Sequence, residues 1–459
     1  MGPFLSWHCI LDIDSATIGR EMVGNRDLAA RTLHSVWHPC TQMKLHEWVP
    51  MVAISHGRGA WLYDVAGRRY LDAISSWWVN LFGHANERIG AAITDQLGRL
   101  EHVILAGFTH EPAVLLSERL SALTAGRLGH CFFASDGSSA VEIALKMSHH
   151  FWRNHGRPDK SRFACLAGAY HGETTGALSV SDVGLFRDAY APLLRPAVMV
   201  PSPDWRRAET GESAVDYAAR CADALERVLQ QRHNEIAALI VEPLVQCASG
   251  MGMYDPQYLR LARALCDRYE VHLIADEIAV GCGRTGTFLA CEQAGILPDL
   301  LCLSKGITGG YLPLSVVLAT DAMFEAFYDD DAARGFLHSH SYSGNALACA
   351  AALATLRIFE DDAVIEANRS RAARIDELAG PLRAHAHVRN FRRTGMIWAF
   401  EVDRAPPLFA RRFSAAALER ELLLRPVGNT VYFMPPYVID EEQAALLVDR
   451  TVGLLDRSI

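Results

Sequence analysis

The sequence predicts an α/β protein with a large domain built on a mostly parallel, buried sheet and a small α+β domain. Between about residues 80 and 360, short and almost continuously apolar runs alternate with helical patterns, which is typical of parallel strands covered by helices on both faces. After about residue 360 the pattern changes to a charged helix, two strands and a closing helix. The length of 459 residues is enough for two or three domains.

We expect the domain boundaries where these patterns change. Residues 76–361 form the expected large domain, and residues 362–459 form the small domain together with an N-terminal segment, 1–75. Residues 1–30 show no clear period, so no regular element is expected there. Residues 50–75 predict a hairpin, because two short alternating runs surround a glycine-containing turn at Ala66 and Gly67.

The expected strands of the large domain are apolar runs, and several of them end directly at a polar or charged residue. Helical patterns separate most of them, and the polar stretch 202–216 is expected to be a surface loop. The strands are expected at 130–135, 162–168, 237–243, 271–277, 299–305 and 313–320.

The C-terminal part predicts a charged helix at 363–385, followed by strands at 395–402 and 430–439. Asp440 and Gln443, three residues apart, form a variant of the capping box and predict the start of the last helix.

Composition excludes several classes of protein. Half of the residues are apolar and 21% are charged, which excludes a disordered chain. The formal net charge of −9 argues against nucleic acid or an anionic membrane as partner. The eleven cysteines are scattered singly without a Cys-x-x-Cys pair, which predicts reduced thiols in the cytoplasm, and no motif predicts a metal site. The longest uncharged stretch, 335–356, contains polar residues and predicts a loop and an alanine-rich helix instead of a membrane span.

Three polar features stand where expected strands end, which is where open α/β sheets bind ligands. The first is the segment 135–139, Ser-Asp-Gly-Ser-Ser, between a strand and a helix. Gly137 allows the backbone to approach a ligand, and Ser138 and the helix N-terminus offer hydroxyl and N–H donors, as in a phosphate site. By itself the segment is more typical of an ordinary helix cap.

The other two features are Asp276, at the end of an apolar run, and Lys305, at the end of the next. Each has an ordinary explanation, as a structural ion pair and a surface lysine respectively. A lysine at the mouth of a buried strand can also have a lowered pKa and act as a Schiff-base nucleophile. A phosphate site, a carboxylate for the ring nitrogen and a lysine for the aldehyde are together what pyridoxal 5′-phosphate requires.

The chain resembles the class III pyridoxal-phosphate aminotransferases over nearly its whole length. The similarity lies in the order of phosphate site, acid and lysine, and in the blocks HLIADEIAVGCGRTGTF (272–288), LSKGITGGYLPLS (303–315) and HSHSYSGNALACAAA (338–352). The resemblance implies fold type I, like aspartate aminotransferase, with a seven-stranded sheet. It implies that Lys305 bonds the cofactor, Asp276 faces its pyridine nitrogen and Gly137 and Ser138 bind its phosphate, while Tyr170 stacks on its ring and takes part in catalysis.

The same resemblance implies a homodimer with shared active sites. In this family the segment that contains Ser341 binds the phosphate of the neighbouring subunit's cofactor. We therefore expect His340 and Ser341 to contact the cofactor and Ser339 to contact the substrate.

A narrower similarity is to the members that aminate 8-amino-7-oxononanoate with S-adenosylmethionine during biotin synthesis. SSWWVNLFGHA (75–85), VWHPCTQM (36–43) and RPVGNTVYFMPPYVI (425–439) resemble them. The resemblance implies that Arg425 binds the substrate carboxylate and that Trp77 and Trp78 line the site with Tyr170 and Lys305. An aromatic wall and one arginine suit an apolar chain that ends in a carboxylate. As an adjacent strand pair, the two rings would lie on opposite faces, so we expect one functional and one structural tryptophan.

Departures from the family pattern leave the amino donor open. Cys40 stands where the family commonly has a tyrosine, at a position that shapes the substrate pocket; Glu173 replaces a common aspartate and Ser341 a common threonine. A lysine-dependent enzyme of the same pathway, or another ω-amino-acid or diamine transaminase, remains the alternative.

A different class is suggested by the segment 281–286, which matches G-x-G-x-x-G and would indicate a nicotinamide oxidoreductase. That motif should open the first βαβ unit, however, and here it lies past the midpoint of the chain. A non-catalytic protein that kept the fold is disfavoured because Asp276 and Lys305 are both present.

Overall fold

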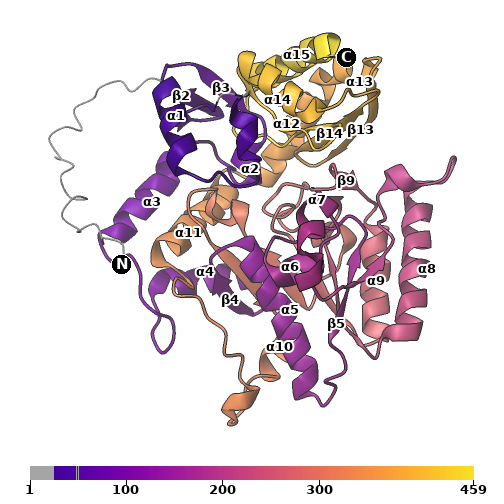
Figure 1. The fold of residues 1–459 in the computed structure, drawn as a ribbon. Coiled ribbons are helices and arrows are strands. Elements are labelled where there is room, and N and C mark those ends of the chain that lie inside the picture. The colour runs from indigo at the N-terminus through magenta and orange to yellow at the C-terminus, as the bar shows by residue number, and fades with distance from the viewer. Residues whose placement is uncertain (1–24, 48, 50, 459) are drawn as a thin grey trace, which may run out of the picture.

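The computed structural model describes residues 25–47, 49 and 51–458 (Figure 1). The expectation for residues 1–24 lies outside the described residues. Helix α1 (Asn25–Ser35) corrects the expectation that 1–30 holds no regular element. Its periodicity is weak, and its apolar residues Leu28 and Ala29 line the same cavity as Leu418 and Leu423.

The large sheet has seven strands in the order β4-β12-β11-β10-β7-β5-β6. All neighbouring pairs are parallel except those of β12, which runs antiparallel to β11 and β4, so the expectation of a mostly parallel sheet is confirmed. All six expected strands are present, and the seventh is the three-residue edge strand β6. The strands are β4 (His130–Ala134), β5 (Arg162–Leu166), β6 (Val198–Val200), β7 (Ile236–Val241), β10 (His272–Asp276), β11 (Leu300–Leu303) and β12 (Ser315–Ala319).

Helices cover both faces of this sheet, which explains its continuous apolar runs. Ile240 and Ile274 pack with the buried face of α5, whereas Leu239 and Leu273 pack with α8 and α9 on the other side. Alternate residues of one strand thus belong to different cores. The helices of this region are α2 (Ser75–Trp78), α3 (Glu87–Leu97), α4 (Glu111–Ala122), α5 (Gly137–Asn154), α6 (Thr175–Ser179), α7 (Gly184–Arg187), α8 (Ala214–Arg232), α9 (Gln257–Arg268), α10 (Asp321–Glu325) and α11 (Ala346–Asp361).

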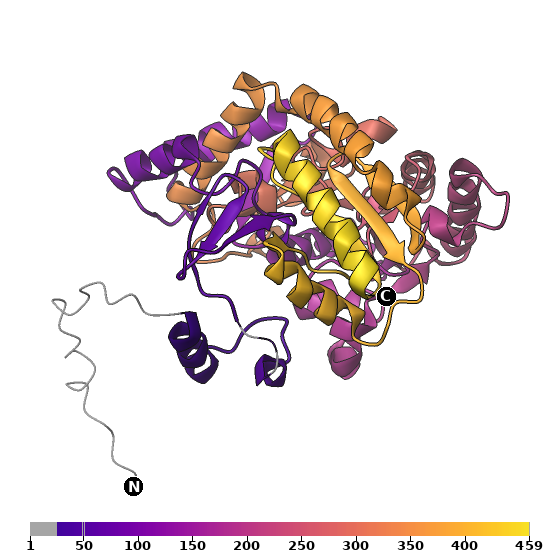
Figure 2. The same cartoon turned by 90° about the horizontal axis from the view of Figure 1, so that it is seen from above.

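The N-terminal strands and the C-terminal part of the chain lie side by side above the large sheet (Figures 1 and 2). They share a four-stranded sheet, in which Leu422 of β15 is opposite Leu71 of β3 in a parallel pair. The boundaries expected at 75/76 and 361/362 stay a prediction. The strands are β1 (Ile54–Arg58), β2 (Trp61–Asp64), β3 (Arg69–Asp72) and β15 (Leu422–Leu423); β13 (Val388–Thr394), β14 (Ile397–Val402) and β16 (Thr430–Phe433) form a second sheet, and β8 (Val245–Gln246) and β9 (Gly252–Met253) a short ladder.

Several small-domain expectations need correction. Residues 50–75 form three strands instead of two, although the turn at Gly67 is present with a φ of +83°. The charged helix divides into α12 (Val364–Leu378) and α13 (Gly380–Ala384), because a Gly-Pro pair interrupts it. The strand expected at 430–439 ends at Phe433, just before two prolines.

The last helix begins as predicted. Asp440 accepts a hydrogen bond from the Gln443 amide at 2.8 Å, and the Gln443 side chain accepts one from the Asp440 amide at 3.3 Å. This reciprocal pair caps α15 (Glu441–Ser458), which packs with α12, α13 and α14 (Phe409–Glu419) and spans the small domain in Figure 2.

Two predictions about surface and loop segments have different outcomes. The stretch 202–216 is not wholly a surface loop, because Ser202 and Asp204 are buried and Asp204 pairs with Arg206. The stretch 335–356 is a loop followed by α11, as expected. None of the helices in the described ranges combines the length and the apolar character needed to cross a bilayer.

Candidate active site

The candidate site lies where three neighbouring strands of the large sheet end. Asp276 is the last residue of β10, Glu242 follows β7, and Lys305 comes two residues after β11. Because these strands are parallel and adjacent, their carboxyl ends lie at one edge of the sheet. The fold therefore brings together the acid and the lysine that the sequence analysis singled out.

The Lys305 side chain points into an environment without a charged partner in contact. Its Nζ lies 4.5 Å from the centroid of the Trp78 ring, and in the described part of the chain no hydrogen bond or ion pair reaches this amine. Burial lowers the pKa of Lys305, while the nearby Cys247, Asp276 and Glu242 partly oppose that shift. Burial thus favours the neutral, nucleophilic form of the amine.

Asp276 is buried and is held by two donors. The Nδ1 of His171 lies 2.7 Å from one carboxylate oxygen, and the amide of Ile278 donates to the other at 3.1 Å. The second ring nitrogen of His171 is buried without a hydrogen-bond partner among the described residues. The sequence analysis missed His171, although it adjoins Tyr170 in the segment AYHGET.

The N-terminus of α5 meets the same region. Asp136 caps this helix by accepting from the Ser139 amide at 3.0 Å, and Gly137 and Ser138 begin its first turn. A Cβ atom on Gly137 would lie 3.0 Å from the Ile278 side chain, and one on Gly172 would lie 2.0 Å from the Ser138 hydroxyl. The approach at Gly172, whose φ is +122°, requires glycine, whereas a side chain at Gly137 would have to displace that of Ile278.

Tyr170 is half-buried between two glutamates. Its amide donates to Glu242 at 3.0 Å, and its hydroxyl donates to Glu173 at 3.0 Å. Burial and the neighbouring Glu173 raise the pKa of Tyr170. Glu242, which the sequence analysis did not single out, also accepts from the Cys247 amide at 3.1 Å, and burial raises the pKa of Glu242 to about 7.

The two tryptophans lie under two different cations. Trp78 is buried, donates from its indole to the Tyr432 hydroxyl at 3.1 Å and faces Lys305. Trp77 is 40% exposed, and the Arg425 guanidinium lies 4.7 Å from its ring centroid. The expected strand is wrong here, because Ser75–Trp78 forms a turn with positive φ at every residue.

Arg425 and Cys40 meet at the outer edge of the site. Arg425 is exposed and donates to the Cys40 carbonyl at 3.3 Å, and the Cys40 thiol is free and exposed. A cavity of about 680 Å³ opens beside Trp77 and Arg425, and most of its lining is apolar, including Leu62, Leu418 and Leu423. The arrangement suits a ligand with an apolar chain and a terminal anion.

Comparison with known proteins assigns the family. The sequence model of the family Aminotransferase class-III matches residues 43–455. The chain is a class-III aminotransferase. Adenosylmethionine-8-amino-7-oxononanoate aminotransferase of Helicobacter pylori is 46% identical over 438 residues, covering 94% of this chain and 98% of that protein. The protein of the same name from Geobacter sulfurreducens is 40% identical and covers 90% of this chain and 94% of its own.

Solved structures agree with this assignment. The enzyme of that name from Methanocaldococcus jannaschii superposes with a TM-score of 0.88 at 32% identity, over 94% of this chain and 99% of that one. An omega transaminase from Pseudomonas jessenii in complex with PMP reaches a TM-score of 0.89 at 28% identity, over 94% and 98% of the two chains. The protein is a pyridoxal-phosphate-dependent aminotransferase of fold type I.

The residues of this aminotransferase fit its cofactor. Lys305 offers an amine with no hydrogen bond or ion pair among the described residues, and Asp276 offers a carboxylate whose other contacts are donors. The amides in the first turn of α5 have no partner within the helix, and the absence of a side chain on Gly172 leaves room for the Ser138 hydroxyl at this helix start. The amine of Lys305 matches the aldehyde of the cofactor, the carboxylate of Asp276 matches its protonated ring nitrogen, and the amides of α5 match its phosphate.

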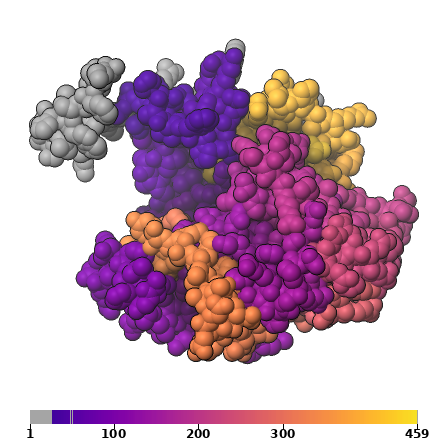
Figure 3. All heavy atoms as spheres, turned by 60° about the horizontal axis from the view of Figure 1, so that its bottom comes forward, coloured from indigo at the N-terminus to yellow at the C-terminus, as the bar shows by residue number. Residues whose placement is uncertain are grey.

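Three predicted residues of the aminotransferase lie elsewhere in the protomer. The Ser341 carbonyl accepts from His102 at 2.7 Å, and the His340 amide donates to Ser343. Within the described chain, no hydrogen bond, ion pair or ring contact joins Ser339, His340 or Ser341 to Lys305 or Asp276. Their segment crosses the surface as the orange band in Figure 3. Their assignment to a neighbouring subunit stays a prediction.

The G-x-G-x-x-G segment of the aminotransferase, 281–286, has a structural role, because its Arg284 contacts two segments that are distant from it in the sequence. Arg284 is fully buried, and its guanidinium donates to the carbonyls of Pro435 at 2.6 Å and Asn80 at 2.9 Å. Its Cζ also lies 4.8 Å from the Tyr437 ring centroid. These contacts give the segment a structural role, so a bound dinucleotide is not needed to account for the motif.

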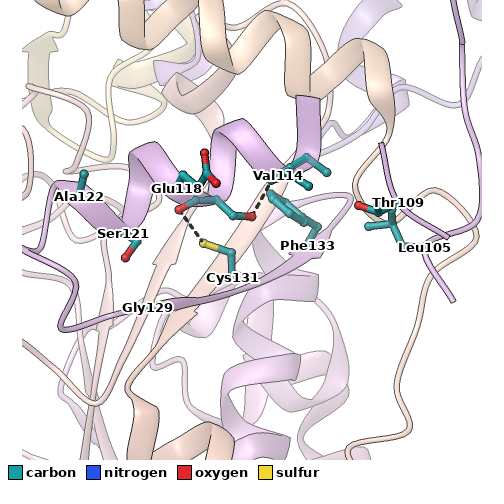
Figure 4. Close-up of a pocket in the computed structure, with 11 residues that line it drawn as sticks. Leu105, Thr109, Val114, Glu118, Ser121, Ala122, Gly129, Cys131 and Phe133 are labelled. Atoms are coloured by element: carbon teal, nitrogen blue, oxygen red, sulfur yellow. Dashed lines mark hydrogen bonds between the residues drawn. The ribbon is translucent and has the colours of Figure 1, made fainter. Parts of the chain in front are cut away.

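A second cavity of the aminotransferase, about 620 Å³ in volume, lies between α4 and β4 (Figure 4). Glu118, Cys131 and Phe133 line it, and the Cys131 thiol donates to the Ser117 carbonyl at 3.8 Å. None of the predicted site residues lines this cavity, so it is separate from the candidate site.

Proposed function

We propose that this aminotransferase transfers an amino group from S-adenosylmethionine to 8-amino-7-oxononanoate, which yields 7,8-diaminononanoate in biotin synthesis. The observation behind the proposal is that two consecutive indole rings lie under two cations, Trp78 under the Lys305 amine and Trp77 under the Arg425 guanidinium. The acceptor has matching parts: a keto group, an apolar chain and a carboxylate. Relatives that bear the name of this enzyme at up to 46% identity support the same substrate pair.

The cofactor, when bound, supplies an electron sink for the bond broken at the amino-bearing carbon. Gly137, Ser138 and the N-terminus of α5 would hold its phosphate, and Asp276 would face its ring nitrogen. The Nδ1 of His171 lies 2.7 Å from Asp276 and so holds this carboxylate in place. Tyr170 and Trp78 would border the ring.

Lys305 has two tasks for which its surroundings suit it. Its amine would be the nucleophile that attaches the cofactor, and burial favours the neutral form of this amine by lowering its pKa. The same amine would also carry the proton that moves between the reacting carbons. The absence of a competing hydrogen bond in the described part of the chain leaves the Lys305 Nζ free to move.

Arg425 is the proposed anchor of the acceptor carboxylate. The Arg425 guanidinium lies 4.7 Å from the Trp77 ring centroid and donates one hydrogen bond to the Cys40 carbonyl, so its other N–H groups can bind a carboxylate. Cys40, which accepts from Arg425 through its carbonyl, borders the same position and is proposed to contact substrate through its small side chain. Because Cys40 is smaller than the tyrosine common at this position in the family, lysine should be tested as a second amino donor.

We further propose a cytoplasmic homodimer with shared sites. Ser339 would contact the substrate, and His340 and Ser341 the cofactor, of the neighbouring subunit. The separation of these residues from Lys305 and Asp276 within one protomer supports this arrangement. The free thiols of the ten described cysteines support a reducing compartment.

A spectral titration tests the proposal. The pyridoxal-phosphate-loaded protein is mixed with S-adenosylmethionine or lysine alone, and the near-visible band of the cofactor is followed; 8-amino-7-oxononanoate is then added. Loss of the band with S-adenosylmethionine and its return with the keto acid are expected. Loss of the band with lysine only would mean that lysine, and not S-adenosylmethionine, is the amino donor. A response to ω-amino acids alone, as for the omega transaminases of similar structure, would replace the proposed acceptor.

A further inference from the structure

Four consecutive residues beneath the site adopt a backbone conformation that L-amino acids disfavour. The φ angles of Ser75, Ser76, Trp77 and Trp78 are +52°, +47°, +74° and +71°. Two hydrogen bonds close the turn, from the Trp78 amide to the Ile74 carbonyl at 2.8 Å and from the Val79 amide to the Ser75 carbonyl at 3.0 Å. None of the four residues is glycine, so the surroundings must hold this left-handed turn in place.

The side chain that holds it most directly is Asp72. This carboxylate is fully buried at the end of β3. One oxygen accepts from the Ser76 amide at 2.8 Å, and the other accepts from the Ser76 hydroxyl at 2.7 Å and lies 3.0 Å from His84 Nε2. At the start of the turn, the Ser75 hydroxyl donates to the Met434 carbonyl at 2.7 Å.

The position of Asp72 is itself well determined. Asp72 is opposite Leu423 in the parallel pair of β3 and β15, and its amide donates to the Ala60 carbonyl at 2.8 Å. A fixed carboxylate that binds both the amide and the hydroxyl of Ser76 determines where the middle of the turn lies. The conformation is thus imposed by contacts from outside the turn.

The consequence for the site is the placement of both indole rings. In an extended strand, adjacent side chains point to opposite faces. In this left-handed turn, Trp78 lies under Lys305 at 4.5 Å and Trp77 lies under Arg425 at 4.7 Å. A relaxed turn would separate at least one ring from its cation.

We infer that Asp72 is a positioning residue, whose carboxylate holds the left-handed turn Ser75–Trp78 so that Trp78 lies under Lys305 and Trp77 lies under Arg425. The role for substrate binding rests on the proposed function; the role in the turn does not. Asp72 touches neither cation and acts only through Ser76 and the rings that follow it.

A matched control is available in Asp64, which is equally buried at the end of the neighbouring strand β2. Its carboxylate accepts from the amides of Ala66 and Arg68, both at 2.9 Å, and from the Tyr70 hydroxyl at 3.0 Å. These bonds fix a different turn, which does not contain the tryptophans. Asp64→Asn therefore reports the general effect of altering a buried carboxylate in this sheet.

The experiment compares the loaded wild-type protein with Asp72→Asn and Asp64→Asn in steady-state kinetics, near-ultraviolet circular dichroism and thermal unfolding. Asp72→Asn is expected to raise the KM for 8-amino-7-oxononanoate about tenfold, to change kcat less than about threefold, and to weaken the tryptophan dichroism. Asp64→Asn is expected to lower Tm without either signature. An unchanged KM and dichroism in Asp72→Asn, or equal changes in both variants, would overturn the inference.

Two further measurements keep the inference testable. If Asp72→Asn does not fold, Ser76→Ala removes only the hydroxyl contact; a rise in KM of about threefold supports the inference, and no change opposes it. If the wild-type protein does not use 8-amino-7-oxononanoate, the proposed function fails, and a crystal structure of Asp72→Asn decides the turn alone. Positive φ angles retained at all four residues would refute the role of Asp72.

Discussion

The two sides of the candidate site are built differently. The inner side consists of Asp276, Glu242 and Lys305, which stand at the ends of adjacent buried strands. The outer side consists of Trp77, Arg425 and Cys40, which are exposed and lie on a strained turn and two loops. Rigid strands hold groups in an orientation that bond-breaking requires, whereas loop side chains can differ between relatives that accept different substrates. Changes to the inner side should therefore abolish chemistry, and changes to the outer side should alter substrate selection.

The largest effect is expected from Lys305→Ala. Without its amine, the protein loses both the nucleophile and the proton carrier, so turnover should fall by at least about 10³-fold and the near-visible cofactor band should vanish. Absorption spectra and single-turnover kinetics measure both. Lys44→Ala, which removes an exposed lysine, serves as the control. Substantial turnover in Lys305→Ala would contradict the assignment of the inner side.

Asp276→Asn should reduce the rate by roughly 10²-fold to 10³-fold while the cofactor stays bound, because a neutral amide does not favour a protonated ring nitrogen. Retention is checked by absorbance after gel filtration, and the rate by stopped-flow mixing with the donor. Glu277→Gln is the matched control, since Glu277 is the adjacent buried carboxylate but binds the amides of Ala290 and Cys291. A rate in Asp276→Asn equal to that of the control would remove Asp276 from the chemistry.

A buried carboxylate next to the inner side, Glu277, should also make stability depend on pH. Burial raises the pKa of Glu277 from 4.5 to about 7, so the folded protein binds a proton more tightly there than the unfolded chain. The resulting stabilisation is present below pH 4.5 and is lost as pH rises through 7. Its loss amounts to about 3 kcal/mol in the free energy of unfolding. In urea unfolding between pH 5 and 8, the free energy of unfolding should fall less steeply with pH for Glu277→Gln than for the wild-type protein. Parallel pH dependences of the two proteins would argue against the raised pKa of Glu277.

The smallest of these effects is expected on the outer side. Arg425→Ala should raise the KM for 8-amino-7-oxononanoate about thirtyfold, as expected for a lost charge-assisted hydrogen bond of about 2 kcal/mol. The half-reaction with the amino donor should proceed at nearly the wild-type rate, as measured by loss of the cofactor band. Arg420→Ala, at the C-terminal cap of α14 and outside the site, provides the comparison. An equal loss in both half-reactions would mean that the two sides are not separable.

Residues missed by the sequence analysis share one property. His171 lies 105 positions from Asp276, and Asp72 gains its significance only from the turn and from His84. Neither residue type is unusual at its position in the sequence, and a histidine after a tyrosine has no distinctive spacing. Their roles arise from contacts between segments that a local pattern does not describe. Glu242 is an intermediate case, because it ends an apolar run as Asp276 does but was not selected.

Local sequence patterns were sufficient to predict the alternation of buried strands and helices and the polar residues at the strand ends. These follow from local periodicity, since a strand buried on both faces must be apolar until the residue at which it leaves the core. Long-range contacts, in contrast, set how β15 joins β3, how His171 meets Asp276, and why four non-glycine residues turn left-handed beneath Lys305 and Arg425. Those outcomes depend on partners distant in sequence, whose combined bonds override the conformational preference of each residue.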